Sequence, residues 1–374
     1  MGATLPQHSP ATATPRPVRP VRPVHPGGDP YGTHRALEPS GGLPQPARRV
    51  DNDFSRLFAG ELLLAVETLN IDAASFRQME EAAAAAGDPS DEAVAALVRE
   101  TVAERGKQHN PVTGSGGMLL GRVLQVCEGH PSLGGAGSLE VGARVATLVS
   151  LSLTPLTVDR VHAVRRPSAQ LDVDGEAVLF ASGAYARLPG DLSDRLALAV
   201  LDVAGAAPQV ARLVSPGQTV LVLGAGGKSG VLCAAEARRR GARVLGVENH
   251  APYADDLRRL GLCDEVLSGD ARDPVAIREA VLRANGGLEV DVSFSCVNVE
   301  DAELAAILCT RDRGVVYFFA MSTSFTKAAL GAEGVGKDVD LFVGNGFARG
   351  HADHTLAMMR ELPAVRALFE ARYG

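Results

Sequence analysis

The chain has little of several features that mark specialised classes of protein. It contains only five cysteines, an odd number with no C-x-x-C pair, which indicates reduced thiols and a cytoplasmic protein. No apolar run approaches the roughly 20 residues that a membrane-spanning helix needs, so we expect no membrane partner. The net charge of −7 offers no general basic character, so we expect no nucleic-acid partner.

What is present is typical of an ordinary globular protein. The 374 residues suggest two domains, and 46% hydrophobic with 22% charged residues is usual for such chains. The start differs, because no acidic residue precedes Asp29 and the run PRPVRPVRPVHP carries Arg16, Arg19 and Arg22. It has no apolar segment of the kind found in targeting peptides, and its prolines forbid an amphipathic helix. We therefore predict a disordered, polyproline-like tail over residues 1–28.

The most informative stretch is residues 219–248, TVLVLGAGGKSGVLCAAEARRRGARVLGVE. Its first five residues are β-branched and aliphatic, which predicts a strand buried on both faces. Three glycines follow at three-residue spacing, then a helix is expected at 231–240 and a second strand at 243–247. This order of strand, glycine turn, helix and strand is that of a dinucleotide-binding unit.

The chemistry of that unit explains its residues. Gly224, Gly227 and Gly230 allow the backbone and the N-terminus of the following helix to approach a pyrophosphate closely. Glu248 lies about 20 residues past the turn, where a carboxylate accepts hydrogen bonds from an adenosine ribose and repels a 2′-phosphate. The sequence therefore predicts NAD rather than NADP as the cofactor.

A competing interpretation is a P-loop, because Gly227-Lys228-Ser229 resembles the end of that motif. The motif requires a glycine five positions before Gly227, where this chain has Val222. Residues 331–338 have suitable glycine spacing and Lys337, but Asp338 replaces the hydroxyl that binds magnesium. We therefore expect no nucleoside triphosphatase.

The region before this unit is mostly β. Strands are expected at 61–66, 121–127, 144–148 and 177–180, and glycine and proline clusters separate them, which is consistent with a small barrel. Two helices interrupt it at 73–86 and 90–105, the second with a turn and cap in the sequence Asp-Pro-Ser-Asp at 88–91.

After the barrel region, residues 192–214 predict one apolar helix. Strands and helices then alternate to the end of the next domain, which indicates a doubly wound parallel sheet. The further strands are expected at 265–267, 290–296, 314–319 and 340–343, with helices at 253–260, 274–285 and 302–309. We expect a C-terminal helical segment at 346–374 that packs back near the cleft.

A barrel followed by such a sheet resembles the medium-chain dehydrogenase/reductase family, and the glycine turn resembles that of its quinone-reductase-like branch. The resemblance implies a GroES-like β-barrel substrate domain at 29–190, with a helical insertion at 73–105, and a Rossmann domain at 191–345. The zinc-binding members carry a cysteine where this chain has residues 68–72 and Gly-His-Glu where it has Gly116-Gly117-Met118. The four-cysteine zinc loop is also missing, so we predict no zinc.

No other metal is predicted. Cys127 with His130, and His351 with His354, each provide two metal-capable side chains without a third and fourth.

Longer strings resemble one zinc-independent branch, the family of L-erythro-3,5-diaminohexanoate dehydrogenases. They are YGTHR at 31–35, LPQP at 43–46, HNPVTGSGG at 109–117, LDVAGA at 201–206, SFTKAALGAEGVGKD at 324–338 and GNGFARGH at 344–351. The resemblance implies NAD-dependent oxidative deamination of the diamino acid to 5-amino-3-oxohexanoate, ammonia and NADH, as in lysine fermentation, by a homodimer. Two alternatives stay open: a zinc-free NAD(P)H-dependent quinone or enoyl reductase, and a non-catalytic dinucleotide-sensing protein.

Ligands of such sheets bind beyond the C-terminal ends of the strands. We therefore expect the cofactor to be bound by Gly224, Gly226, Gly227, Lys228, Ser229, Gly230, Glu248, Asn249, Cys296, Asn298, Met321 and Ser322. Cys296 ends an expected buried strand, so it could equally be a packing residue.

The loop at 107–115 is unusually dense in polar residues for this chain. The implied reaction needs a base, so we expect His109 or Lys107 to act as base, while Thr113 and Ser115 position the substrate and Asn110 binds it. His109 could instead be a hydrogen-bonded structural residue.

Two further groups are needed for the charges of the substrate. We expect Glu333 or Asp338 to pair with its 5-ammonium and Lys337 with its carboxylate. The alternative is that Lys337 and Asp338 form a solvated turn.

Overall fold

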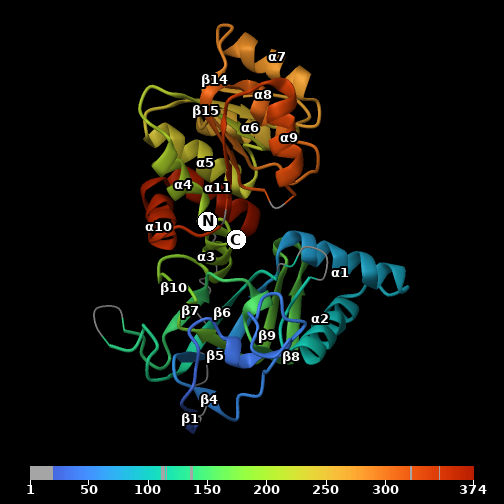
Figure 1. Cartoon of the computed structure of the whole chain (residues 1–374), viewed down its shortest axis with the longest axis vertical. Coiled ribbons are helices and arrows are strands. Elements are labelled where there is room, and N and C mark those ends of the chain that lie inside the picture. Colours follow the sequence, from blue (N-terminus) through green and yellow to red (C-terminus); the bar gives the residue numbers. More distant parts are fainter. Residues whose placement is uncertain (1–19, 111–113, 115, 135–137, 321, 345) are drawn as a thin grey trace, which may run out of the picture.

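A computed structural model describes residues 20–110, 114, 116–134, 138–320, 322–344 and 346–374. The chain forms a β-rich lobe from its first half and an α/β lobe from its second, with helices α3, α10 and α11 between them (Figure 1). This is the predicted fold class, a barrel-type substrate domain followed by a Rossmann domain. Thr113, Ser115 and Met321 lie outside the described residues.

The first lobe contains a six-stranded antiparallel sheet in the order β10-β7-β6-β5-β9-β8. Its strands are β5 (Glu61–Asn70), β6 (Met118–Val126), β7 (Arg144–Thr147), β8 (Leu156–Arg165), β9 (Gln170–Phe180) and β10 (Tyr185–Arg187). The predicted strands are present, and β5 and β9 are longer than expected. β8 was not predicted, because it stands at the end of the sheet and exposes polar side chains such as Asp159 and Arg160.

The two inserted helices form as predicted. They are α1 (Ala73–Ala85) and α2 (Asp91–Arg105). Each begins at a capping side chain: Asp72 accepts a hydrogen bond from the Ser75 N–H, and Ser90 accepts one from the Ala93 N–H. Buried Val94, Val98 and Val102 of α2 pack into the core beneath the sheet.

The prediction of a disordered tail over residues 1–28 is wrong for residues 20–28. The Arg22 N–H donates to Gln125 Oε1 (2.8 Å), Gln125 Nε2 donates to the Arg22 carbonyl (3.0 Å), and the Arg22 guanidinium pairs with Glu176 (2.8 Å). Strand β1 (Val24–His25) then pairs in parallel with β4 (Leu57–Phe58). Residues 1–19 lie outside the described residues.

A buried ion pair holds the next segment, which contains β2 (Ala36–Glu38) and β3 (Arg49–Val50). Arg35 is fully buried and its Nε donates to Glu61 Oε1 (2.6 Å). Burial by itself raises the pKa of Glu61, but hydrogen bonds from Arg35 and His34 outweigh it and lower that pKa below its usual value. Glu61 is therefore ionised at neutral pH and ties the entry segment to the start of β5.

The second lobe is an all-parallel sheet in the order β13-β12-β11-β14-β15-β16. Its strands are β11 (Thr219–Leu223), β12 (Arg243–Val247), β13 (Glu265–Leu267), β14 (Val290–Ser295), β15 (Thr310–Phe318) and β16 (Asp340–Val343). Helices α5 (Lys228–Arg239), α6 (Ala251–Leu260), α7 (Pro274–Ala284) and α8 (Glu303–Cys309) connect them as predicted. A further helix, α9 (Phe325–Val335), was not predicted.

The predicted single helix at 192–214 is two helices, α3 (Asp194–Leu201) and α4 (Ala206–Leu213), bent by 43°. The turn between them passes close to another loop, because a Cβ atom on Gly205 would lie 2.4 Å from the Gly346 carbonyl oxygen. The C-terminal segment forms α10 (His351–Glu361) and α11 (Pro363–Tyr373), which pack against α3.

Two apolar clusters cover the two faces of the parallel sheet. Residues of α3, α4, α5, α10 and α11 pack on one face, and residues of α7, α8 and α9 pack on the other. Among the described residues, no single helix is long and apolar enough to cross a membrane; α3 and α4 pass that test together by length and composition only.

Candidate active site

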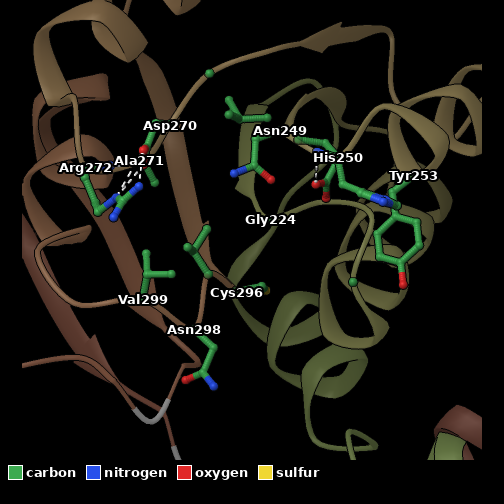
Figure 2. A pocket seen from close by; sticks show the side chains of 15 residues that line it. Gly224, Asn249, His250, Tyr253, Asp270, Ala271, Arg272, Cys296, Asn298 and Val299 are labelled. Atoms are coloured by element: carbon green, nitrogen blue, oxygen red, sulfur yellow. Dashed lines mark hydrogen bonds and ion pairs between the residues drawn. The ribbon is translucent and has the colours of Figure 1, made fainter. Parts of the chain in front are cut away.

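A pocket of about 310 Å³ lies at the C-terminal ends of β11, β12 and β14 (Figure 2). Six of the predicted cofactor-binding residues line it: Gly224, Gly227, Glu248, Asn249, Cys296 and Asn298. The C-terminal ends of parallel strands in a doubly wound sheet are where ligands bind. The pocket therefore lies where the sequence leads us to expect the cofactor.

The glycine turn has the backbone geometry that its residues predict. Gly224 has φ of +71°, a conformation that side-chain-bearing residues rarely adopt. A Cβ atom on Gly230 would lie 2.1 Å from the Gly224 carbonyl oxygen, so only glycine lets α5 begin this close to the turn. The first N–H groups of α5, at Lys228 and Ser229, have no acceptor within the helix and can bind phosphate oxygens.

Glu248 is held in place by the turn. It is 7% exposed, and its Oε2 and Oε1 accept hydrogen bonds from the N–H groups of Gly226 (2.9 Å) and His250 (2.9 Å). A carboxylate oxygen can accept a second hydrogen bond, so both oxygens keep an acceptor position for a hydroxyl. A Cβ atom on Gly226 would lie 2.7 Å from Glu248 Oε2, so this position requires glycine. The residues present therefore fit the adenosine ribose of NAD.

The structure adds pocket residues that the sequence did not reveal. His250 and Tyr253 follow Glu248, and their rings meet edge to face at 4.5 Å. Asp270 and Arg272 come from the loop after β13 and pair at 2.6 Å on the opposite wall (Figure 2). Hydrogen bonds from Arg272 lower the pKa of Asp270 to about 2. The rule that ligands contact the ends of the strands could have indicated the loop after β13, but not these side chains.

Arg372, near the end of the chain, clamps the glycine turn from outside. Its Nη1 donates to the Gly226 carbonyl (2.6 Å), its Nη2 pairs with Asp256 (2.7 Å), and its guanidinium lies 3.8 Å from the ring centre of Tyr253. Nothing in the local sequence of residues 346–374 indicates this contact, because its partners lie more than 100 positions away.

The predicted residues on the other side of the pocket also come together. The Ser322 hydroxyl donates to the Val299 carbonyl (3.1 Å), which joins the loop after β15 to the loop after β14 that carries Asn298. Cys296 lies 3.8 Å from the buried Cys233, sulfur to sulfur. The Lys228 side chain points to Asp202 (3.2 Å), so only its backbone belongs to the glycine turn in this structure.

In the barrel lobe, Lys107 occupies a structural position. It is fully buried, and its Nζ donates to the carbonyls of Pro44 (2.7 Å) and Gln45 (2.9 Å). Burial lowers the pKa of Lys107 to about 8, with a smaller contribution from Arg105, whereas the two carbonyl acceptors favour its ammonium form. This placement contradicts a role for Lys107 as base, because both contacts keep its proton.

His109 remains available for chemistry. Its Nδ1 is buried and has no hydrogen-bond partner among the described residues, which does not support the alternative of a hydrogen-bonded structural histidine. Burial, and then the charges of Lys107 and Arg105, lower the pKa of His109 below its usual value. The ring is therefore neutral at neutral pH and can accept a proton.

Asn110 is buried and joins its loop to the start of α1. Its Nδ2 donates to Ser75 Oγ (3.0 Å), and the Ser75 hydroxyl donates to Asp72. A Cβ atom on Gly117 would lie 2.0 Å from the Asn70 carbonyl oxygen, so the same loop also passes close to the end of β5. The contacts of Asn110 fix the loop that carries His109.

The predicted substrate residues Glu333, Lys337 and Asp338 lie at the wrong edge of the parallel sheet. Lys337 Nζ pairs with Glu289 (2.6 Å) and donates to the Thr310 carbonyl (2.9 Å), at the N-terminal ends of β14 and β15. Glu333 is exposed in the last turn of α9. The unpredicted helix α9 explains the error, because it carries the chain from the ligand-binding edge back to the opposite edge.

Among the described residues, no group of three or more histidine, cysteine, aspartate or glutamate side chains is placed to hold a metal ion. His351, one of the metal-capable residues, instead contacts the Ala348 carbonyl through Nδ1 (2.7 Å).

Known proteins are similar to this chain over both of its lobes. A family model described as the L-erythro-3,5-diaminohexanoate dehydrogenase N-terminal domain matches residues 34–189. The chain is 50% identical to L-erythro-3,5-diaminohexanoate dehydrogenase of Acetoanaerobium sticklandii over 346 residues, 92% of this chain and 98% of that protein. It is 48% identical to the protein of the same name from Fusobacterium nucleatum, with the same coverage.

Among solved structures, the fold is similar to Escherichia coli quinone oxidoreductase complexed with NADPH. The TM-score is 0.50 at 17% identity, over 82% of this chain and 80% of that one. This similarity shows the fold alone.

Glu248→Gln tests the cofactor assignment. The change removes the charge and turns an N–H donor toward one of the two backbone N–H groups that now donate to the carboxylate. Losing a charge-assisted hydrogen bond costs roughly 1.5–3 kcal/mol, or about 10- to 100-fold in affinity for NADH. NADPH binding should weaken less, because the repulsion of the 2′-phosphate is also removed. Fluorescence titration with both cofactors measures the ratio, and Glu265→Gln, at the exposed start of β13, is the control. An unchanged ratio would remove Glu248 from the ribose site.

Proposed function

Because the chain belongs to the family of L-erythro-3,5-diaminohexanoate dehydrogenases, we infer that it catalyses the NAD-dependent oxidative deamination of L-erythro-3,5-diaminohexanoate. The products are 5-amino-3-oxohexanoate, ammonia and NADH, in a reaction of lysine fermentation. The observation that carries this conclusion is identity of about half of all residues along 98% of each relative.

The geometry of the glycine turn supports the proposal on the cofactor side. NAD, when bound, accepts the hydride from C3 of the substrate. The N–H groups at the start of α5 would bind its pyrophosphate, and Glu248 its adenosine ribose. Asn298 and Ser322 stand on the loops after β14 and β15, on the side where the nicotinamide would lie.

We propose that His109 is the base. The 3-amine must lose its proton before hydride can leave C3, and water must then be activated to attack the carbon–nitrogen double bond. A neutral imidazole can take the proton of the 3-ammonium, release it to solvent and then take a proton from the attacking water, and the lowered pKa of His109 favours both the neutral ring and that release. Asn110, through Ser75 and Asp72, would hold the loop of His109 against α1.

The alternative of a quinone or enoyl reductase loses support. The quinone oxidoreductase of similar fold is 17% identical, whereas the diaminohexanoate dehydrogenases are 48–50% identical. The charged residues expected to pair with the diamino acid, Glu333, Lys337 and Asp338, do not line the pocket, so they do not distinguish the two activities. The choice between dehydrogenase and reductase activity therefore depends on the difference in sequence identity.

We also propose that the chain forms a homodimer through β16. This strand is at one end of the parallel sheet, where its outer backbone groups have no strand partner among the described residues. Val343 and Phe347 beside it are 62% and 51% exposed. A second copy pairing with this edge would bury both the backbone groups and the apolar side chains.

A cytoplasmic location is proposed as well, because all five cysteines are free thiols, as expected in a reducing compartment. Cell fractionation followed by the dehydrogenase assay would test it.

The activity is tested with purified protein, NAD and L-erythro-3,5-diaminohexanoate. We expect NADH and ammonia in equal amounts, followed by absorbance and by an ammonia assay, with slower turnover when NADP replaces NAD. Binding of NADH without turnover would overturn the activity and favour the dinucleotide-sensing alternative.

His109→Gln should lower kcat by about 100-fold or more, the usual contribution of a general base. NADH affinity should stay within about twofold, because His109 lies outside the cofactor pocket. In the wild type, kcat/KM should fall as the pH drops through the lowered pKa of His109, since only the neutral ring accepts a proton. His162→Gln, an exposed histidine paired with Asp174, is the control. Turnover equal to that of the control would remove His109 from the site.

Light scattering on a sizing column tests the dimer. The wild type should have twice the 38.9 kDa mass of one chain. Val343→Lys should give monomers, because it places a charge on the edge that pairs. Val141→Lys, at a site 73% exposed in the barrel lobe between β6 and β7, should stay dimeric. A monomeric wild type, or a dimeric Val343→Lys variant, would contradict the proposed interface.

A further inference from the structure

An ion pair between Asp202 and Lys228 stands beside the glycine turn. Lys228 Nζ lies 3.2 Å from Asp202 Oδ2, and the two side chains are 26% and 28% exposed. Lys228 is the first residue of α5, and Asp202 directly follows α3. Both charges therefore keep access to solvent next to the expected position of the cofactor pyrophosphate.

The pair lies on the nicotinamide side of the site. The part of the pocket that fits adenosine, around Glu248 and the loop with Asp270, follows β12 and β13, at one end of the sheet order. The turn at 202–205 is instead linked to the loop after β16, at the other end, because Gly205 closely approaches Gly346. A dinucleotide that crosses the C-terminal edge from β12 therefore reaches β14 and β15 with its nicotinamide, on the side of Asp202.

Asp202 stands at the C-terminal end of α3, where a nearby cation is electrostatically favourable. Its backbone N–H caps α3 by donating to the carbonyls of Leu198 and Val200. The C-terminus of a helix carries partial negative charge, so a carboxylate there is unfavourable unless a cation accompanies it. The last turn of α3 contains no basic residue, and Lys228, from another helix, supplies that cation.

The substrate of the proposed function brings cations of its own. L-erythro-3,5-diaminohexanoate has a reacting amine at C3 and a second amine at C5, which is an ammonium at neutral pH. Several other acidic residues are already engaged or remote: Glu248 is at the adenosine end, Asp301 on the loop after β14 pairs with Lys327, and Asp338 is at the opposite edge of the sheet.

We propose that Asp202 binds the 5-ammonium of the substrate, which deepens and rests on the proposed function. Lys228 stands between Asp202 and the glycine turn, so its ammonium can turn to a pyrophosphate oxygen of the bound cofactor. The Asp202 carboxylate is then left for the substrate. Cofactor binding would thus precede substrate binding at this position.

The test compares L-erythro-3,5-diaminohexanoate with 3-aminohexanoate, which lacks the 5-amine. The wild type should prefer the diamino acid in kcat/KM. Asp202→Asn should lower kcat/KM for the diamino acid by about 10- to 100-fold, mainly through KM, as expected for the loss of one charge-assisted hydrogen bond. For 3-aminohexanoate, measured as a substrate or as an inhibitor, the change should stay within about threefold.

Asp191→Asn is the matched control, because Asp191 pairs with Arg360 (2.9 Å) just before the other end of α3. It should leave the preference between the two compounds unchanged. NADH titration of Asp202→Asn, with a Kd within about twofold of the wild type, verifies that the variant is folded.

Three results would overturn the inference. Equal losses of Asp202→Asn with both compounds would show a structural role, and unchanged kinetics would show no role. An Asp202→Asn variant that no longer binds NADH would show that the pair supports the glycine turn instead. Absence of NADH formation by the wild type would overturn the proposed function itself, and this outcome is distinct because it appears before any variant is made.

Discussion

The hydrogen bonds of Gly226 hold the cofactor site together, and the placement of its other residues depends on them. The Gly226 N–H donates to Glu248 at the end of β12, and the Gly226 carbonyl accepts from Arg372 at the end of the chain. A buried carboxylate without such donors would be costly, so the turn and Glu248 stabilise one another. Gly226, which has no side chain, thus joins a neighbouring strand and the C-terminal helix through its backbone alone.

This arrangement connects the cofactor turn to the junction of the lobes. Helix α11, which carries Arg372, packs against α3, and Asp194 at the start of α3 pairs with Arg144 of the barrel (2.6 Å). The same helix ends at Asp202, beside Lys228 of α5. A few packed helices therefore link the barrel, the glycine turn and the residues on the nicotinamide side, as Figure 1 shows for α3, α10 and α11.

The sequence predicted those parts of the protein whose signals are local. The glycine turn and Glu248 depend on backbone geometry within 30 residues, and the strand–helix alternation depends on periodicity. Asp202 and Arg372 could not be predicted as neighbours of the turn, because only the packing of α3 and α11 brings them there. Lys337 was misplaced for a related reason. Because α9 was not predicted, we did not expect the chain to return to the N-terminal edge of the sheet before β16 begins.

The charges of the substrate explain why the two lobes would carry different kinds of residues. Removing hydride from C3 requires a neutral amine, so the base must itself be neutral, and burial near two cations would keep the proposed base, His109, in that form. The 5-amine is different, because it does not react and is bound most strongly as an ammonium. A carboxylate at the negative end of α3 favours that form. A neutral base at His109 and a carboxylate at Asp202 would together orient a molecule that has two similar amines. The 5-amine would lose an ion pair if it lost its proton, whereas the 3-amine would not, so the 3-amine would be the one that is deprotonated.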